Sequence, residues 1–143
     1  MHPETQVFKA PSYTVEGLAL FLYQCIRERG ELPIIAMTGD LGAGKTTLSQ
    51  HLCALFGVED VVSPTFAIWN LYEGTEGTIH HFDLYRIDEE QELDEVGFFD
   101  AISSGELVLI EWANRFPHLI PNDAWWVHLG FDDHGERYAE VKR

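Results

Sequence analysis

Basic side chains are scarce in this sequence. Lysine and arginine together number 9, against 24 aspartate and glutamate residues, and the formal net charge is −15. A surface that binds nucleic acid or an anionic membrane needs lysine and arginine to neutralise phosphates. The composition therefore argues against broad direct binding to nucleic acid and against a membrane surface, and it favours a basic partner protein.

Cysteines are few, and long apolar runs are absent. Cys25 and Cys53 both fall within helical patterns, so we expect buried free thiols rather than a disulfide framework. No apolar run approaches the ~20 residues that span a bilayer, and residues 1–6 lack the positive region and apolar core of a signal peptide. We therefore expect a cytoplasmic protein. Its 143 residues are consistent with one domain that covers residues 1–143.

One stretch carries a specific chemical pattern. Residues 39–46 match G-x-x-x-x-G-K-[ST], the phosphate-binding loop of nucleoside-triphosphatases. Glycines allow successive backbone N–H groups to point at phosphate oxygens, while Lys45 brings a positive charge and the Thr46 hydroxyl can ligate Mg²⁺. The expected nucleotide contacts from this stretch are Gly39, Asp40, Leu41, Gly42, Ala43, Gly44, Lys45, Thr46 and Thr47.

The residues around this loop supply the context that the pattern requires. The apolar run 33–38 predicts a strand buried on both faces, and leucines at helical spacing predict a helix over residues 45–56. A first helix is predicted over residues 14–29, with a cap at its start. An acidic helix is expected to begin at Asp88, where Gln91 completes a capping box.

Strands alternate with these helices. They are predicted over residues 67–72, 78–84, 106–112, 125–131 and 137–141. The first two are joined by a short glycine-containing loop, as are the last two, so each of these pairs is expected to form an antiparallel hairpin. We therefore predict an α/β fold of the single-domain P-loop NTPase type, with a mixed sheet, helices on both faces and an antiparallel hairpin.

Two carboxylates follow predicted strands. Glu111 ends the apolar run 107–110, and Asp83 follows the strand that ends near Phe82. We assign Glu111 to Mg²⁺, directly or through water, because its strand is the more continuously apolar and hence the more central. Asp83 is then expected to polarise the attacking water or to support the metal ligands. The reverse assignment stays open.

Four motifs together resemble the TsaE family of bacterial P-loop ATPases. They are Gly39–Thr47, Ser63–Phe66, His81–Arg86 and Ile110–Trp112, in matching order and spacing. The resemblance implies a part in making N6-threonylcarbamoyladenosine at position 37 of tRNAs. It implies ATP and Mg²⁺ as cofactors and the proteins TsaD and TsaB as partners, with tRNA contacted only indirectly.

The resemblance also extends the set of expected site residues. Thr65 is expected to act as a switch residue that senses the γ-phosphate, and it joins Asp83 and Glu111 as a catalytic candidate. The likeness runs from about Thr14 to Arg137, and we include these two residues among the expected nucleotide contacts.

Two rival functions belong to other classes. A nucleotide-gated binding module with negligible turnover would use the same Lys45, Thr46 and Glu111. A small-molecule kinase would normally place arginines in a lid over the phosphates, whereas only Arg86 and Arg115 lie in the middle of this chain.

Three aromatic side chains near these motifs are interpreted without a chemical role. His80 and His81 are adjacent on a predicted strand, so they point to opposite faces and cannot form a joint metal site. We interpret both as structural. Trp112 is interpreted as a core residue or as an anchor that faces a partner.

Overall fold

The computed structural model describes residues 5–59 and 68–143. Within these residues, one mixed sheet has the strand order β1-β7-β6-β2-β5-β4-β3. The Ser63–Phe66 motif, and Thr65 within it, lie outside the described residues. The elements in chain order are β1 (Thr5–Lys9), α1 (Val15–Arg29), β2 (Ile34–Thr38), α2 (Lys45–Leu55), β3 (Trp69–Gly74), β4 (Gly77–Asp83), α3 (Glu90–Glu95), α4 (Phe98–Ile102), β5 (Leu107–Glu111), the 3-10 helices η1 (Ala113–Arg115) and η2 (Pro117–Leu119), β6 (Trp125–Phe131) and β7 (Arg137–Lys142).

Parallel pairing defines the centre of the sheet. β2 lies between β5 and β6 and is parallel to both, and β4 runs parallel to β5 on its other side. Antiparallel pairs flank this centre: β3 joins β4, β6 joins β7 and β7 joins β1. The carboxyl ends of β2, β4 and β5 therefore meet at one edge, where Met37 and Asp83 both stand opposite Glu111 in register.

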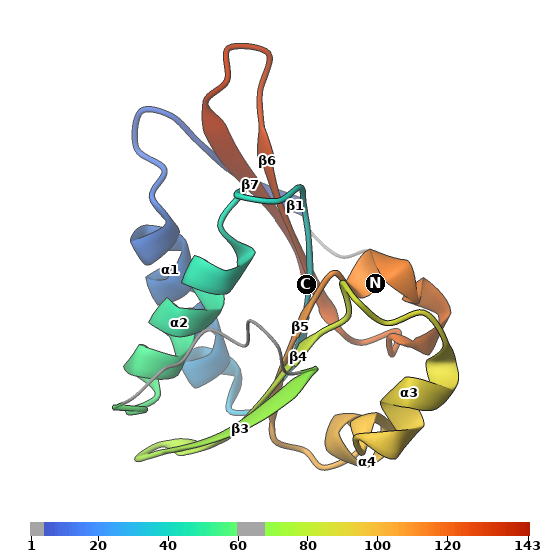
Figure 1. Cartoon of the computed structure of the whole chain (residues 1–143). Coiled ribbons are helices and arrows are strands. Elements are labelled where there is room, and N and C mark those ends of the chain that lie inside the picture. Colours follow the sequence, from blue (N-terminus) through green and yellow to red (C-terminus); the bar gives the residue numbers. More distant parts are fainter. Residues whose placement is uncertain (1–4, 60–67) are drawn as a thin grey trace.

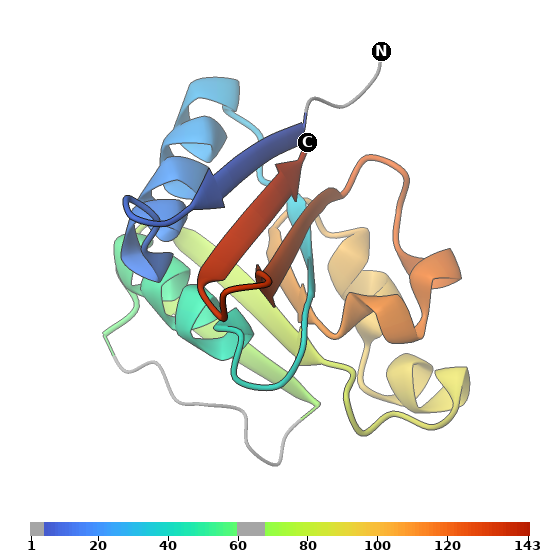
Figure 2. The same ribbon diagram turned by 90° about the horizontal axis from the view of Figure 1, so that it is seen from above.

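Helices cover both faces of this sheet, as the sequence predicted. Figure 1 shows α1 and α2 on one side and α3 and α4 on the other, and Figure 2 shows the same layers from above. Each side has its own hydrophobic cluster. Ile35 and Leu109 belong to the cluster under α1 and α2, while Ala36 and Ile110 belong to the other. Strand β5 is buried along its whole length, as expected for a central parallel strand.

Local sequence explains where the first helices begin and end. The Thr14 hydroxyl caps α1 by accepting the N–H of Gly17 at 3.0 Å, which confirms the predicted helix start. α1 stops at Gly30, whose φ of 76° is a conformation that favours glycine. Cys25 and Cys53 are free and buried, as predicted.

Two details differ from the prediction. Thr5–Lys9 forms the unpredicted strand β1, because its stability comes from pairing with the distant β7 rather than from its own short pattern. The capping box of α3 lies one residue later than predicted, on Glu89 and Glu92 instead of Asp88 and Gln91. The N–H groups of Asp88 and Glu89 both donate to the Glu92 carboxylate, a stronger acceptor than the Gln91 amide.

No helix in the described part of the chain is long and apolar enough to cross a membrane.

Candidate functional site

The glycine loop connects β2 to α2 at the edge where the parallel strands end. Gly39 has a φ of 138° and Gly44 a φ of 114°, both conformations that favour glycine. A Cβ atom on Gly39 would lie 2.1 Å from the Leu129 carbonyl oxygen, so only glycine lets the loop pass this close to β6. Gly44 is also the N-cap of α2, where no side chain caps the helix and no acidic residue lies in the first turn. The start of α2 therefore suits an anion.

Lys45 is the first residue of α2, and only 5% of it is exposed. Its ammonium group donates to the carbonyl oxygens of Gly39 and Asp40, the latter at 2.9 Å, and lies 4.2 Å from the centroid of the Trp112 ring. Burial lowers the pKa of Lys45, while nearby carboxylates, Glu111 most strongly, raise it. The loop thus holds a poorly hydrated cation that an anionic ligand would stabilise.

Glu111 is a buried carboxylate held from two sides. One oxygen, Oε1, accepts the Thr46 hydroxyl at 2.8 Å, and the other, Oε2, lies 2.6 Å from Nε2 of His81. Glu111 is 2% exposed and His81 is 1% exposed. The contact between Thr46 and Glu111 brings together residues from α2 and β5. The two predicted Mg²⁺ ligands are therefore neighbours in the structure.

Asp83 ends β4 beside Glu111. Its Oδ1 accepts the N–H of Tyr85 at 3.0 Å. Burial raises the pKa of Asp83, the hydrogen bond from Tyr85 lowers it, and the charge of Glu111 raises it again, with a net increase. A carboxylate whose pKa is raised binds a proton more readily than an ordinary aspartate, which suits a group that accepts a proton from water.

Trp112 follows Glu111 and also lies at this site. Among the described residues, Trp112 is the only non-glycine residue with a positive φ, which is 58°. This conformation costs free energy for a bulky side chain. Its ring packs against Tyr85 at 4.7 Å between centroids, and the ammonium group of Lys45 lies over it. The sequence-based interpretation of Trp112 as a core residue or partner anchor missed this place beside the lysine.

These residues surround a cavity of about 210 Å³. It is lined by Leu41, Gly42, Gly44, Lys45, Thr46, Thr47, Asp83, Tyr85, Glu111, Trp112 and Arg137. A neighbouring cavity of about 500 Å³ shares Thr47 and Arg137 with it and is also lined by Tyr13 and Thr14. The Arg137 guanidinium donates to the Gly42 carbonyl oxygen at 3.2 Å, which ties β7 to the glycine loop.

Most of the predicted contacts therefore converge on this pair of cavities. Gly39 and Asp40 take part through their carbonyl oxygens, which accept hydrogen bonds from Lys45. Ala43 is buried and lines neither cavity. Thr14 lines the larger cavity, although its hydroxyl already caps α1. Thr65, which lies outside the described residues, stays a prediction.

The structure adds residues that sequence reasoning missed. Tyr85 and Trp112 line the smaller cavity, and the structural interpretation of His81 overlooked its contact with Glu111. One sequence signal pointed to His81: residues two apart on a strand share a face, so His81 lies on the same side of β4 as Asp83. His80 points to the other side, as predicted, and pairs with Glu106 at 2.9 Å.

The oxygen donors fit a magnesium ion that is bound together with a nucleotide. Among the described residues, no three His, Cys, Asp or Glu side chains gather in a way that could hold a metal ion. Thr46, Glu111 and Asp83 offer hard oxygen atoms, the kind that Mg²⁺ prefers. In nucleotide sites Mg²⁺ takes few protein ligands and completes its coordination with water and phosphate, so a full set of protein ligands is not needed.

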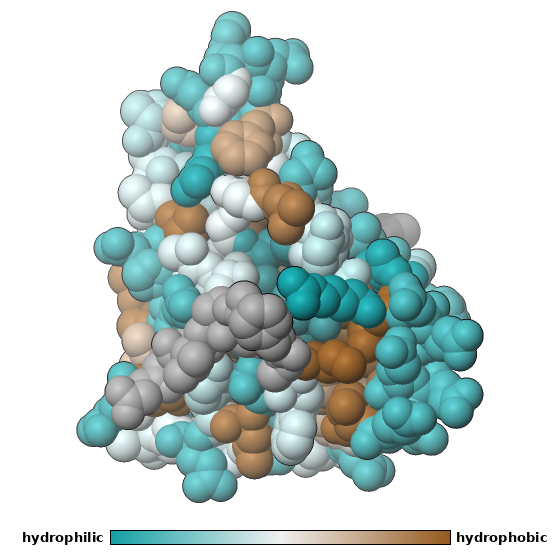
Figure 3. Space-filling model, viewed as in Figure 1, coloured by the Kyte–Doolittle hydropathy of each residue, from teal (hydrophilic) through white to brown (hydrophobic). Residues whose placement is uncertain are grey.

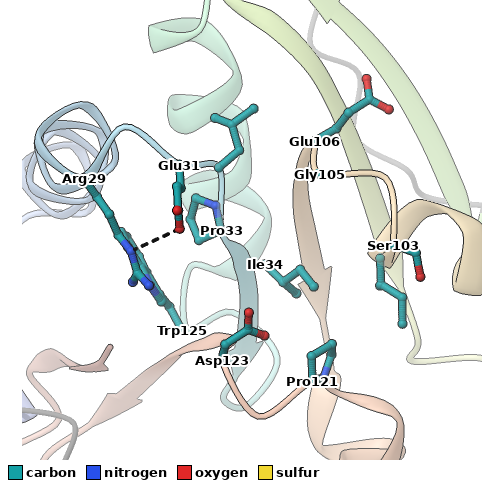
Figure 4. A pocket seen from close by; sticks show the side chains of 12 residues that line it. Arg29, Glu31, Pro33, Ile34, Ser103, Gly105, Glu106, Pro121, Asp123 and Trp125 are labelled. Atoms are coloured by element: carbon teal, nitrogen blue, oxygen red, sulfur yellow. Dashed lines mark ion pairs between the residues drawn. The ribbon is translucent and has the colours of Figure 1, made fainter. Parts of the chain in front are cut away.

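A different cavity, of about 280 Å³, lies at the opposite end of the parallel strands. Figure 4 shows Arg29 and Glu31 on one side of it, joined by an ion pair of 3.8 Å, with Ser103 and Glu106 on the other. It contains none of the residues predicted for the site. Three of its four charged side chains are acidic, so it does not suit a phosphate.

Replacing Asp83 with asparagine is expected to raise the melting temperature at neutral pH. The raised pKa means that ionised Asp83 disfavours the folded state above that pKa, and this effect disappears as the pH falls towards the ordinary aspartate value of about 3.9. We expect an increase of about 2 °C at pH 7, small because Asp83 is only half-buried, and little difference near pH 4. Thermal unfolding across this pH range measures it, with Asp133→Asn in the exposed hairpin turn as control. A lower melting temperature at pH 7 would contradict the assigned cause.

The fold and the loop first define a general class, an α/β protein whose glycine loop follows a central parallel strand. A family model described as Threonylcarbamoyl adenosine biosynthesis protein TsaE matches residues 12–139. The chain belongs to the TsaE family.

Curated relatives agree with this family, and a solved structure shares the fold. A Nostoc protein called tRNA threonylcarbamoyladenosine biosynthesis protein TsaE is 36% identical over 143 residues, covering 96% of this chain and 85% of that protein. The Rickettsia conorii protein of the same name is 36% identical over 110 residues, covering 76% of this chain but only 62% of that protein. The crystal structure of Bacillus subtilis YdiB matches with a TM-score of 0.73 at 21% identity, covering 99% of this chain and 87% of that one. At this identity the structural match shows the fold alone.

Proposed function

We propose that this chain is a cytoplasmic, Mg²⁺-dependent P-loop ATPase that serves the formation of N6-threonylcarbamoyladenosine at position 37 of tRNA. It acts on a complex of the proteins TsaD and TsaB and contacts tRNA only through them. The observation that carries the proposal is the convergence of Lys45, Thr46 and Glu111 on one cavity, although Glu111 lies 65 residues after Thr46 in the sequence.

The loop and α2 bind the phosphates. The first turn of α2 is free of acidic residues and has no side-chain cap, so its N–H groups suit phosphate oxygens. Lys45 supplies the cation. Hydrogen bonds to two loop carbonyl oxygens hold the Lys45 ammonium group at the cavity. Burial lowers the pKa of Lys45 because it disfavours the charged form, and a phosphate in the cavity would offset this cost of burying the charge.

The oxygen donors organise the reaction. A magnesium ion bound with ATP neutralises charge that develops on the phosphates. The Thr46 hydroxyl donates a hydrogen bond to Glu111, so the lone pairs of the hydroxyl oxygen are available for the ion. Asp83, with its raised pKa, lies next to Glu111 and orients the attacking water.

The larger cavity suits the base and ribose. It adjoins the smaller cavity at Thr47 and Arg137, so a ligand whose phosphates lie at the loop can extend into it. Tyr13 lines this cavity, and its buried hydroxyl has no hydrogen-bond partner among the described residues. An unpaired buried hydroxyl costs free energy, and a polar group of the ligand would remove that cost.

The surface charge supports a division of labour with the partner proteins. With a formal net charge of −15, the chain is poorly suited to bind tRNA by itself. Figure 3 shows hydrophilic side chains gathered over the region of α3, where Glu89, Glu90 and Glu95 are exposed. This surface suits a basic partner rather than an RNA backbone.

A nucleotide-gated binding module is the alternative that one observation favours. Arg137 is the single arginine among the described residues that lines the smaller cavity, and it already bonds to the loop. A site with few cations to stabilise transition-state charge turns over slowly unless a partner supplies more.

Phosphate release from ATP, measured with the chain alone and with TsaD and TsaB added, separates the two functions. An ATPase is expected to show slow release alone and faster release with the partners. Nucleotide binding without release under either condition would replace the ATPase with the gate. An absence of nucleotide binding would contradict both.

A further inference from the structure

The proposed function assigns no role to the buried hydrogen bond between His81 and Glu111. We propose that His81 is a positioning residue: it fixes the Glu111 carboxylate beneath Thr46 and thereby sets how strongly Mg²⁺ increases nucleotide affinity. This inference rests on the proposed function, because it assigns His81 a role at the same Mg²⁺–nucleotide site.

The geometry holds Glu111 by both oxygens. His81 lies 2.6 Å from Oε2, and Thr46 lies 2.8 Å from Oε1. Glu111 sits on β5, His81 on the neighbouring β4 and Thr46 on α2, so three separate elements converge on one carboxylate. A side chain held at both oxygens has little rotational freedom.

Burial makes these donors necessary. Glu111 and His81 are almost fully enclosed, at 2% and 1% exposure, so water does not solvate the carboxylate. A buried carboxylate without donors is unstable and would protonate or turn away. Two donors satisfy both carboxylate oxygens and keep Oε1 directed at Thr46, the residue proposed to contact the ion.

The surroundings of the two ring nitrogens of His81 indicate which of them carries the proton. Within the described part of the chain, Nδ1 of His81 is buried and has no hydrogen-bond partner. A neutral ring with the proton on Nε2 donates to Glu111 and leaves Nδ1 as an unpaired acceptor. The other tautomer would set a lone pair against the carboxylate and leave a buried N–H unpaired, which costs more.

The chain offers a matched control on the same strand. His80 also pairs through Nε2 with a glutamate, Glu106, at 2.9 Å, while the Trp69 indole donates to its Nδ1 at 3.2 Å. His80 points to the other face of β4, away from the glycine loop. Both histidines therefore have the same kind of partner, but only His81 is connected to the proposed Mg²⁺ site.

The test compares four variants with the wild type: His81→Leu, His81→Asn, His81→Gln and His80→Leu. Calorimetry measures the affinity for a non-hydrolysable ATP analogue in EDTA and in Mg²⁺, and thermal unfolding checks the fold. The readout is the ratio of the two affinities. A merely structural histidine would lower stability without changing that ratio.

His81→Leu is expected to keep the wild-type affinity in EDTA and to lose about 10- to 100-fold of the Mg²⁺ enhancement, the effect typical of groups that orient a metal ligand. His81→Gln places an amide N–H near the position of Nε2 and is expected to retain most of the enhancement. His81→Asn, whose side chain is one methylene shorter, is expected to lose the Mg²⁺ enhancement. If His81→Leu does not fold, the comparison of His81→Gln with His81→Asn tests the positioning role. His80→Leu is expected to match the wild type.

Folded His81→Leu or His81→Asn with the wild-type ratio would overturn the positioning role and leave the proposed function intact. An equal loss in His80→Leu would also overturn it. A wild-type chain that does not bind the analogue would overturn the proposed function and this inference together.

Discussion

Lys45→Ala is expected to abolish nucleotide binding at ordinary concentrations. The loop loses its side-chain cation, which lies within the cavity and whose pKa is already lowered by burial. Hydrogen bonds to charged groups contribute about 1.5–3 kcal/mol each, and Lys45 can offer more than one to the phosphates. We therefore expect at least a ~100-fold loss of affinity, equivalent to about 2.7 kcal/mol. Isothermal calorimetry with ATP measures it.

Two variants control this experiment. Lys142→Ala removes an exposed lysine of β7 and is expected to bind ATP like the wild type. Lys45→Met keeps an unbranched aliphatic side chain but removes the ammonium group that lies over the Trp112 ring, so it separates loss of the cation from loss of packing. If either Lys45 variant, shown to be folded, bound ATP with unchanged affinity, the assignment of this lysine would be wrong.

Glu111→Gln is expected to remove Mg²⁺-dependent hydrolysis while sparing binding. The amide keeps one oxygen but loses the charge, and its NH₂ group faces the donor of either Thr46 or His81. We expect turnover to fall by at least ~100-fold, and affinity in EDTA to stay within about threefold of the wild type. Phosphate release and calorimetry measure the two effects.

Glu106→Gln is the matched control. Glu106 also pairs with a histidine, and it directly precedes β5, at the opposite end of this strand from Glu111. It is expected to hydrolyse ATP like the wild type, in both the absence and the presence of the partner proteins. Wild-type turnover in Glu111→Gln, together with its loss in Asp83→Asn, would reverse the roles assigned to the two carboxylates.

The glycine loop could be predicted from the sequence because its chemistry is local. The residues from Gly39 to Thr47 are consecutive, and the strand before them and the helix after them are set by short apolar patterns. The same holds for α1, where Thr14 and Gly30 mark the two ends. Both faces of the sheet were predicted to carry helices, and the structure confirms this.

The rest of the site depends on which strands become neighbours. Glu111 and Asp83 were predicted as strand-end carboxylates, but only the order β2-β5-β4 places them in register at the glycine loop. No sequence pattern gives that order. Strand β1 was missed for the same reason, since its partner β7 lies at the other end of the chain.

The aromatic residues of the site show a different limit. Trp112 was interpreted as a core residue or as an anchor that faces a partner, because these are the usual places of a large aromatic side chain. Its backbone turns at a φ of 58° directly after β5, and this turn carries the ring under Lys45. His81 looked structural because its neighbour His80 excluded a joint metal site. That reasoning considered the histidines as a pair and did not ask which carboxylate each of them faces.

The most direct test is a crystal structure of the chain grown with Mg²⁺ and a non-hydrolysable ATP analogue. We predict phosphates against the start of α2 and Lys45, a magnesium ion beside Thr46 and Glu111, and the base in the cavity lined by Tyr13 and Arg137. An analogue bound elsewhere, or a glycine loop that stays empty at saturating concentrations, would contradict the account.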